Sequence, residues 1–111
     1  MRRCRRCEPV PEEVGLAADL LGRRWLLQVL YAAHTGATRF NEFRQSVGPV
    51  SPRTLAQRLG ELEAAGIVER VVVDARPPYV EYRLTEEGRR LEIVVEALRR
   101  WAGARVSVGR T

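Results

Sequence analysis

The sequence predicts a small, mostly α-helical domain with one β-hairpin, and three observations support this fold class. Apolar residues recur at helical spacing in several segments of the 111-residue chain, and capping residues or glycines bound these segments. In the middle of the chain, Gly48-Pro49 separates two short helical segments. Nearer the C-terminus, a β-branched run over residues 67–73 and an alternating run over residues 80–84 flank a turn with two consecutive prolines.

Two helices are expected before the middle of the chain. The first, over residues 11–21, begins at Pro11 with two glutamates in its first turn, and Val14 lies on its apolar face. The second, over residues 25–34, carries a wide apolar band that is typical of a helix at the centre of a small domain. We therefore expect Trp25 to belong to the core rather than to a binding surface.

The segment over residues 39–69 predicts two short helices joined by a tight turn. Asn41 is suited to cap the first helix, which ends at Val47. Ser51 is the expected N-cap of the second, over residues 52–65, with proline at its first helical position. In that second helix, three leucines share one side and must be buried: Leu55, Leu59 and Leu62. A short helix, a turn and a second helix of this kind is the arrangement that reads the major groove of DNA.

The polar residues of the second helix lie off the leucine stripe, near its N-terminal end. Arg53 and Gln57 are one turn apart and are the expected contacts to base edges, whereas Ser51, Thr54 and Arg58 are expected to contact phosphates. Residues 39–58 contain four arginines and one acid, which predicts a positive patch here. The complete set of expected DNA contacts is Arg39, Asn41, Ser51, Arg53, Thr54, Gln57, Arg58 and Arg76.

The predicted hairpin is interpreted as a wing beside these helices, and Arg76 at its tip is expected to reach phosphates or the minor groove. A last helix, over residues 86–102, is capped by Thr85 and carries more apolar surface than one side of a small domain requires. We interpret this surface as a dimer interface shared with the first helix. The alternative is ordinary packing within one chain. Its expected residues are Val14, Leu91, Val94, Val95, Leu98 and Trp101.

Several of these motifs occur together, in the same order, in a known family. The runs RFNEFRQSV, VSPRTLAQRLGELEAAGIVER and RPPYVEYRLTEEGRRL, with AADLLGRRWLLQVL upstream, resemble the HxlR-type winged helix-turn-helix transcriptional regulators. The resemblance covers roughly residues 12–101. It implies a small homodimer that binds double-stranded DNA. From the residues themselves, we expect residues 11–102 to form the DNA-binding domain, residues 1–10 a flexible basic tail and residues 103–111 a second flexible tail.

Cys4 and Cys7 are the only cysteines, and three interpretations of their C-x-x-C spacing stay open. They are incidental thiols of a tail, a redox pair whose reactivity the four flanking arginines raise, or two ligands of a zinc ion bridged by a dimer. The resemblance implies an oxidant- or electrophile-sensing cysteine just before the first helix. This sequence has Glu12 at about that place, with its cysteines further upstream.

Composition and motifs exclude other classes of function. A hydrophobic content of 45% with 30% charged residues argues against disorder, and no apolar run approaches the roughly 20 residues that span a bilayer. The basic N-terminus lacks the apolar stretch of a secretory signal, so we expect a cytoplasmic protein. With one histidine and no nucleophile or phosphate-loop motif, we expect no catalytic site, metal or cofactor. The alternative to DNA binding is a winged-helix module for protein interaction.

Overall fold

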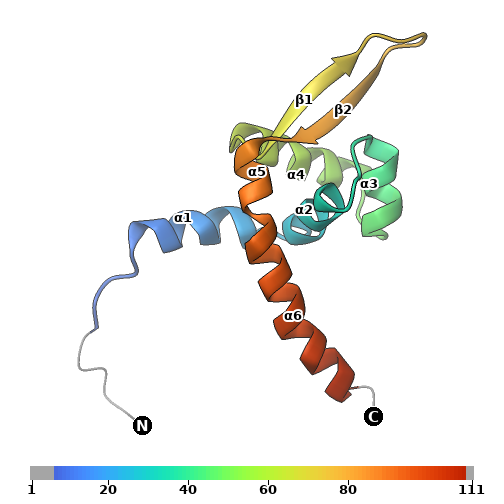
Figure 1. Cartoon of the computed structure of the whole chain (residues 1–111). Helices are drawn as coiled ribbons and strands as arrows, with labels where there is room; N and C mark the ends of the chain where they lie inside the picture. Colours follow the sequence, from blue (N-terminus) through green and yellow to red (C-terminus); the bar gives the residue numbers. More distant parts are fainter. Residues whose placement is uncertain (1–6, 110–111) are drawn as a thin grey trace.

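The computed structural model describes residues 7–109, and it confirms a mostly helical fold with one antiparallel hairpin (Figure 1). The elements in chain order are α1 (Glu12–Leu21), α2 (Leu26–His34), α3 (Phe40–Val47), α4 (Pro52–Ala64), β1 (Val68–Val73), β2 (Tyr79–Leu84), α5 (Glu86–Arg90) and α6 (Glu92–Gly109). Among the described residues, no helix combines the length and apolar character needed to cross a membrane.

The core forms where α2, α3 and α4 meet. Leu26, Val29 and Leu30 of α2 are fully buried, which confirms the expected central position of this helix. The leucine stripe of α4 and Phe43 of α3 are also fully buried and belong to the same cluster. Trp25 packs against this cluster, but the prediction that it lies within the helix is wrong. It precedes α2 with a left-handed φ of 73° and is half-buried.

The connection between α3 and α4 is short and partly buried. Gly48 ends α3 with a φ of 89°, a conformation that L-residues with side chains rarely adopt. Val50 then enters the core with 5% of its surface exposed. The next helix begins as predicted, because the Ser51 hydroxyl accepts a 3.1 Å hydrogen bond from the amide of Thr54.

The predicted cap of α3 is wrong. Asn41 lies inside the helix, which begins at Phe40. The carboxylate of Glu42 takes the capping role instead, since it accepts hydrogen bonds from the backbone amides of Arg39 (2.9 Å) and Thr38 (3.0 Å). These amides would otherwise be unpaired at the helix N-terminus, where a negative charge is also favoured by the helix dipole.

The hairpin pairs Val68 with Leu84 at its base and Val73 with Tyr79 near its tip, so residues 74–78 form the turn. Its base is attached to the helices by a 2.7 Å hydrogen bond from the amide of Tyr82 to the carbonyl oxygen of Thr38. The Tyr82 ring also meets Phe43 edge-on, with 6.5 Å between ring centroids. The tip projects away from the helices (Figure 1).

The C-terminal segment differs from the single helix that the sequence predicted. It is divided at Leu91, and its second part continues to Gly109, well beyond the expected end at residue 102. Thr85 is confirmed as a cap, because its hydroxyl accepts a hydrogen bond from the amide of Gly88. Gly88 permits the first part to lie against β1, since a Cβ atom there would overlap the carbonyl oxygen of Ile67. The His34 ring, 2.9 Å from the Gly88 carbonyl oxygen, links this part to α2.

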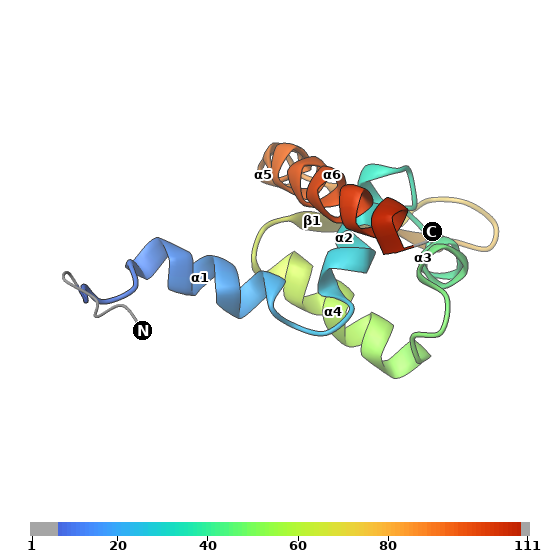
Figure 2. The ribbon, with the colours of Figure 1, turned by 90° about the horizontal axis from the view of Figure 1, so that it is seen from below.

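Two helices extend away from the core. Figure 2 shows α1 pointing out to one side, and none of its residues is buried. In Figure 1, α6 leaves the domain on the side opposite the hairpin. The radius of gyration is 17.0 Å, whereas a compact domain of about 100 residues has about 13 Å. A large part of the apolar surface of these helices is therefore exposed within residues 7–109.

The capping role of Glu42 makes stability depend on pH. Hydrogen bonds from the amides of Arg39 and then Thr38 lower the pKa of Glu42 below its ordinary value of 4.5. A lowered folded-state pKa stabilises the fold above the ordinary value, and that contribution disappears as the pH falls through the folded-state pKa. We expect wild type to lose more stability than Glu42→Gln between about pH 5 and pH 3, measured by urea unfolding.

Glu63→Gln on α4 is the matched control for that comparison, because its carboxylate makes no hydrogen bond or ion pair within residues 7–109. This control should follow the wild-type pH dependence. Parallel curves for wild type and Glu42→Gln would contradict the assigned role of Glu42.

Candidate nucleic-acid interface

Burial of the leucine stripe leaves the opposite side of α4 facing solvent. Arg53 and Gln57 are both exposed on this side, one turn apart, as the sequence predicted. Ala56 and Gly60 lie beside them on the same face, and a Cβ at Gly60 would meet open space. The outer face of α4 therefore has two long polar side chains, and the residues beside them are small. The small residues are a feature that our sequence interpretation missed, although the spacing of 56 and 60 could have revealed it.

The hydroxyls at the N-terminal end of α4 are organised by the cap. Ser51 donates a 2.9 Å hydrogen bond to the Thr54 hydroxyl while it accepts from the Thr54 amide. Ser51 is exposed and Thr54 is half-buried. Both residues therefore lie at a helix N-terminus, where free backbone amides and the helix dipole favour an anion such as a phosphate.

Arg58 does not lie with the other predicted contacts. Its guanidinium donates to the carbonyl oxygen of Arg24 (2.6 Å) and to the carboxylate of Glu61 (2.9 Å), and only 14% of the side chain is exposed. Arg23 pairs with the same carboxylate. Arg58 thus connects α4 to the segment before α2, a structural role that differs from the expected phosphate contact.

A second group of polar side chains lies at the start of α3, next to the hairpin. The Arg39 guanidinium is 3.6 Å from the centre of the Tyr79 ring, so the Arg39 side chain stacks on the face of this ring, which belongs to β2. Asn41 is exposed and lines a groove with Arg39 and Tyr79. Arg44, which the sequence analysis did not select, is exposed one turn along α3 and lines a shallow depression with Asn41.

Arg76 is exposed in the hairpin tip. Figures 1 and 2 both place this tip, α3 and the N-terminal end of α4 on one side of the molecule, away from α1. Arginines from three separate elements thus share one side, and within residues 39–58 the one carboxylate, Glu42, is engaged at the helix cap. This distribution makes the surface positive and suits a polyanion.

The residues selected for the dimer interface are divided between the core and the surface. Val95 is 5% exposed and belongs to the core of its own chain. Very little of this residue is available to a partner, so its assignment to the interface is wrong. Leu91 also packs against the core. The others are exposed to differing extents: Val14, Val94, Leu98 and Trp101.

The predicted redox candidates are only partly described. Cys4 lies outside residues 7–109, and Cys7 is disulfide-bonded. Within the described residues, no three histidine, cysteine or acidic side chains gather as they would around a metal ion.

Comparison with known proteins agrees with this geometry. Residues 20–109 match the HxlR-like helix-turn-helix family. The uncharacterised HTH-type transcriptional regulator YybR of Bacillus subtilis is 43% identical over 88 residues, which cover 79% of this chain and 70% of YybR. The HTH-type transcriptional regulator YodB of the same organism is 40% identical over 86 residues, which cover 78% of this chain and 77% of YodB.

Solved structures give the same result. The redox regulator HypR in its reduced form superimposes with a TM-score of 0.79 at 39% identity, covering 89% of this chain and 98% of HypR. Reduced YodB from B. subtilis superimposes with a TM-score of 0.75 at 36% identity, covering 85% and 92%. The chain therefore belongs to the HxlR-like helix-turn-helix family of transcriptional regulators.

Proposed function

We propose that the chain regulates transcription as a homodimer that reads a two-fold symmetric DNA site through the outer face of α4. The observation that carries the proposal is the pair Arg53 and Gln57 above Ala56 and Gly60. Arg and Gln are long enough to reach guanine and adenine edges in the major groove. The small neighbours let the helix approach the bases closely, so these two side chains supply the base contacts.

The remaining contacts position the helix on the sugar-phosphate backbone. Ser51, Thr54 and the amide of Arg53 bind one phosphate at the N-terminus of α4, and Arg39 and Asn41 bind another at the start of α3. The stacking of Arg39 on Tyr79 supports this role, because a side chain already held in place loses less entropy on binding. Arg76 extends the contact from the wing. Arg58 is not included, because its donors are used within the chain.

The homodimer is proposed from the surfaces of α1 and α6. Ile93 and Trp101 of α6 are 77% and 62% exposed, and Leu16 of α1 is 72% exposed. Large apolar side chains that are this exposed are unfavourable in water, and pairing with a second chain would cover them. A two-fold dimer would present two α4 helices to half-sites about one turn of DNA apart.

The alternative, an interaction module without DNA specificity, has less support. Protein interfaces depend on buried aromatic and aliphatic anchors, and the outer face of α4 presents none. Its exposed residues are polar or small, and the neighbouring elements contribute arginines. The family match also favours DNA.

A redox response is proposed from the cysteines and the relatives. HypR is described as a redox regulator with reduced and oxidised forms, and YodB has been crystallised after diamide treatment and with bound quinone. We propose that Cys4 and Cys7 respond to such oxidants. Two thiols lose two electrons and two protons when a disulfide forms, and a reagent such as diamide takes them up. The change alters the segment before α1 and thereby the proposed dimer interface.

The first prediction from this proposal concerns two arginines of α4. Arg53→Ala should weaken binding to the specific site by about 1–3 kcal/mol and leave the melting temperature unchanged, because Arg53 is exposed and faces outward. Arg58→Ala should instead lower the melting temperature, because it leaves Glu61 and the Arg24 carbonyl with fewer partners. Band-shift titrations and thermal unfolding measure both effects. Equal operator affinity for wild type and Arg53→Ala would contradict the placement of α4.

The second prediction concerns assembly. Ile93→Asp should convert a particle of two-chain mass into one of single-chain mass, because it places a charge in the proposed interface. Val72→Asp on β1 is the matched control, since Val72 is also an exposed β-branched apolar residue, at 61%, and β1 lies on the side of the domain opposite α6 (Figure 1). Light scattering reports the mass. A single-chain mass for wild type, with and without DNA, would exclude the dimer.

The third prediction concerns oxidation. Diamide treatment should lower the operator affinity of wild type and leave a Cys4→Ser, Cys7→Ser double variant unchanged, because only wild type can form the disulfide. Band shifts of both proteins, reduced and oxidised, provide the comparison. If the two wild-type samples bind equally well, the cysteines have no regulatory role of this kind.

A further inference from the structure

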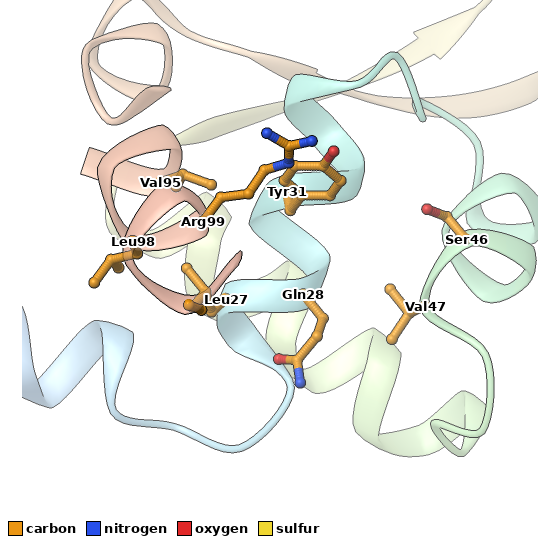
Figure 3. A pocket seen from close by; sticks show the side chains of 9 residues that line it. Leu27, Gln28, Tyr31, Ser46, Val47, Val95, Leu98 and Arg99 are labelled. Carbon is orange, nitrogen blue, oxygen red and sulfur yellow. The ribbon is translucent and has the colours of Figure 1, made fainter. Parts of the chain in front are cut away.

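An apolar pocket of about 310 Å³ lies between α2, α3 and α6, away from the outer face of α4. Its apolar lining comes from all three helices and consists of Leu27, Val47, Val95, Leu98 and Ala102. Figure 3 shows α6 on one side of the pocket and α3 on the other, with α2 between them. The volume is at the lower end of the range for small-molecule sites, so a ligand here would be small.

The pocket adjoins the surface predicted for the dimer interface at Leu98, but its inner wall faces the chain's own α2 and α3. Successive residues of a helix turn by about 100°, so Val95 and Ala102, seven residues apart, share the side that faces the chain's own α2 and α3. Ile93 and Trp101 project from another side, more than a quarter of a turn away, and are strongly exposed. A second copy that covers Ile93 and Trp101 would therefore leave Val95 and Ala102 facing the pocket.

Four polar side chains surround the apolar lining, and three of them are unpaired in the part of the chain that the structure describes. Within residues 7–109, the side chains of Gln28, Tyr31 and Ser46 make no hydrogen bond. All three can donate one. Arg99 lines the same pocket and adds a positive charge. Its ion pair with Glu96 is long, at 3.2 Å, and the side chain is 60% exposed, so this pair competes only weakly with a ligand.

We propose that this pocket binds a small amphipathic acid, a single carboxylate on one aromatic ring or a short branched chain. Its apolar body would lie on Leu27, Val47 and Leu98, which removes both surfaces from water. Its carboxylate would pair with Arg99 and accept a hydrogen bond from Tyr31. A positive charge with neutral donors favours an anion over a neutral or cationic molecule of the same shape.

The pocket also connects the two parts of the proposed regulator, and this step rests on the proposed function. Ser46 and Val47 belong to the last turn of α3, immediately before the connection to α4. The opposite wall belongs to α6, which carries the proposed dimer surface. A ligand that touches both walls alters the angle between them, so ligand and DNA affinities are coupled by the same factor in both directions.

The direct test is a titration of the full chain with benzoate and its neutral analogue benzamide, followed by NMR shifts of backbone amides and methyl groups. Benzoate should bind about tenfold more tightly than benzamide, with shifts at Leu27, Val47, Val95 and Leu98. Arg99→Gln should abolish the preference for benzoate. Arg100→Gln is the matched control, because Arg100 is the next arginine of α6, is 80% exposed and does not line the pocket.

Ala102→Phe should fill the pocket and abolish benzoate binding at an unchanged two-chain mass. Operator affinity should change severalfold with saturating benzoate in wild type and not in Ala102→Phe. Three results would overturn the site: no saturable shifts, equal binding of benzamide, or loss of the two-chain mass in Ala102→Phe. The third result would mean that this face contacts a second copy of the chain. Saturable binding without any effect on operator affinity would overturn its regulatory role. Because the titration uses no DNA, a failure of DNA binding itself would be recognised separately.

Discussion

Burial of the α4 leucine stripe against α2 and α3 is the constraint on which the rest of this structure depends. Leu55, Leu59 and Leu62 have no exposed surface, and each fully buried leucine contributes about 1.5–3 kcal/mol. A helix rotated about its axis would bring polar side chains into this apolar contact at a large free-energy cost. The packing therefore fixes which side of α4 faces outward, and it fixes the positions of Arg53 and Gln57 without any direct contact to them.

The polar contacts then hold this arrangement in register. A small network of polar contacts joins α4 to the segment before α2. It consists of Arg58, Glu61, Arg23 and the carbonyl of Arg24. Arg53 and Arg58 are five residues apart on α4 and have different roles. Arg58 is held inside the chain by the Arg24 carbonyl oxygen and the Glu61 carboxylate, while Arg53 remains available to a partner. On the other side, Glu42 and the hydrogen bond between Tyr82 and Thr38 hold α3 and the hairpin together.

The sequence predicted those features that depend on neighbouring residues. The Ser51 and Thr85 caps, the leucine stripe, the central position of α2 and the two strands follow from local spacing, and the structure confirms them. The errors arise where residues far apart meet. The role of Arg58 depends on a carbonyl 34 residues away, and Val95 is buried by helices near the start of the chain. The break at Leu91 is also absent from the prediction, and the close approach of Gly88 to Ile67 just before it is a contact that no local pattern encodes.

The central claim is that the outer face of α4 reads DNA sequence, and selection of bound duplexes from a random pool tests it most directly. Wild type should recover a consensus with two inverted half-sites about one helical turn apart. Gln57→Ala should recover the same consensus with the preference relaxed at one position in each half-site, because an adenine contact of the kind Gln makes would be lost. A pool without any consensus, or a consensus that Gln57→Ala leaves unchanged, would contradict the account.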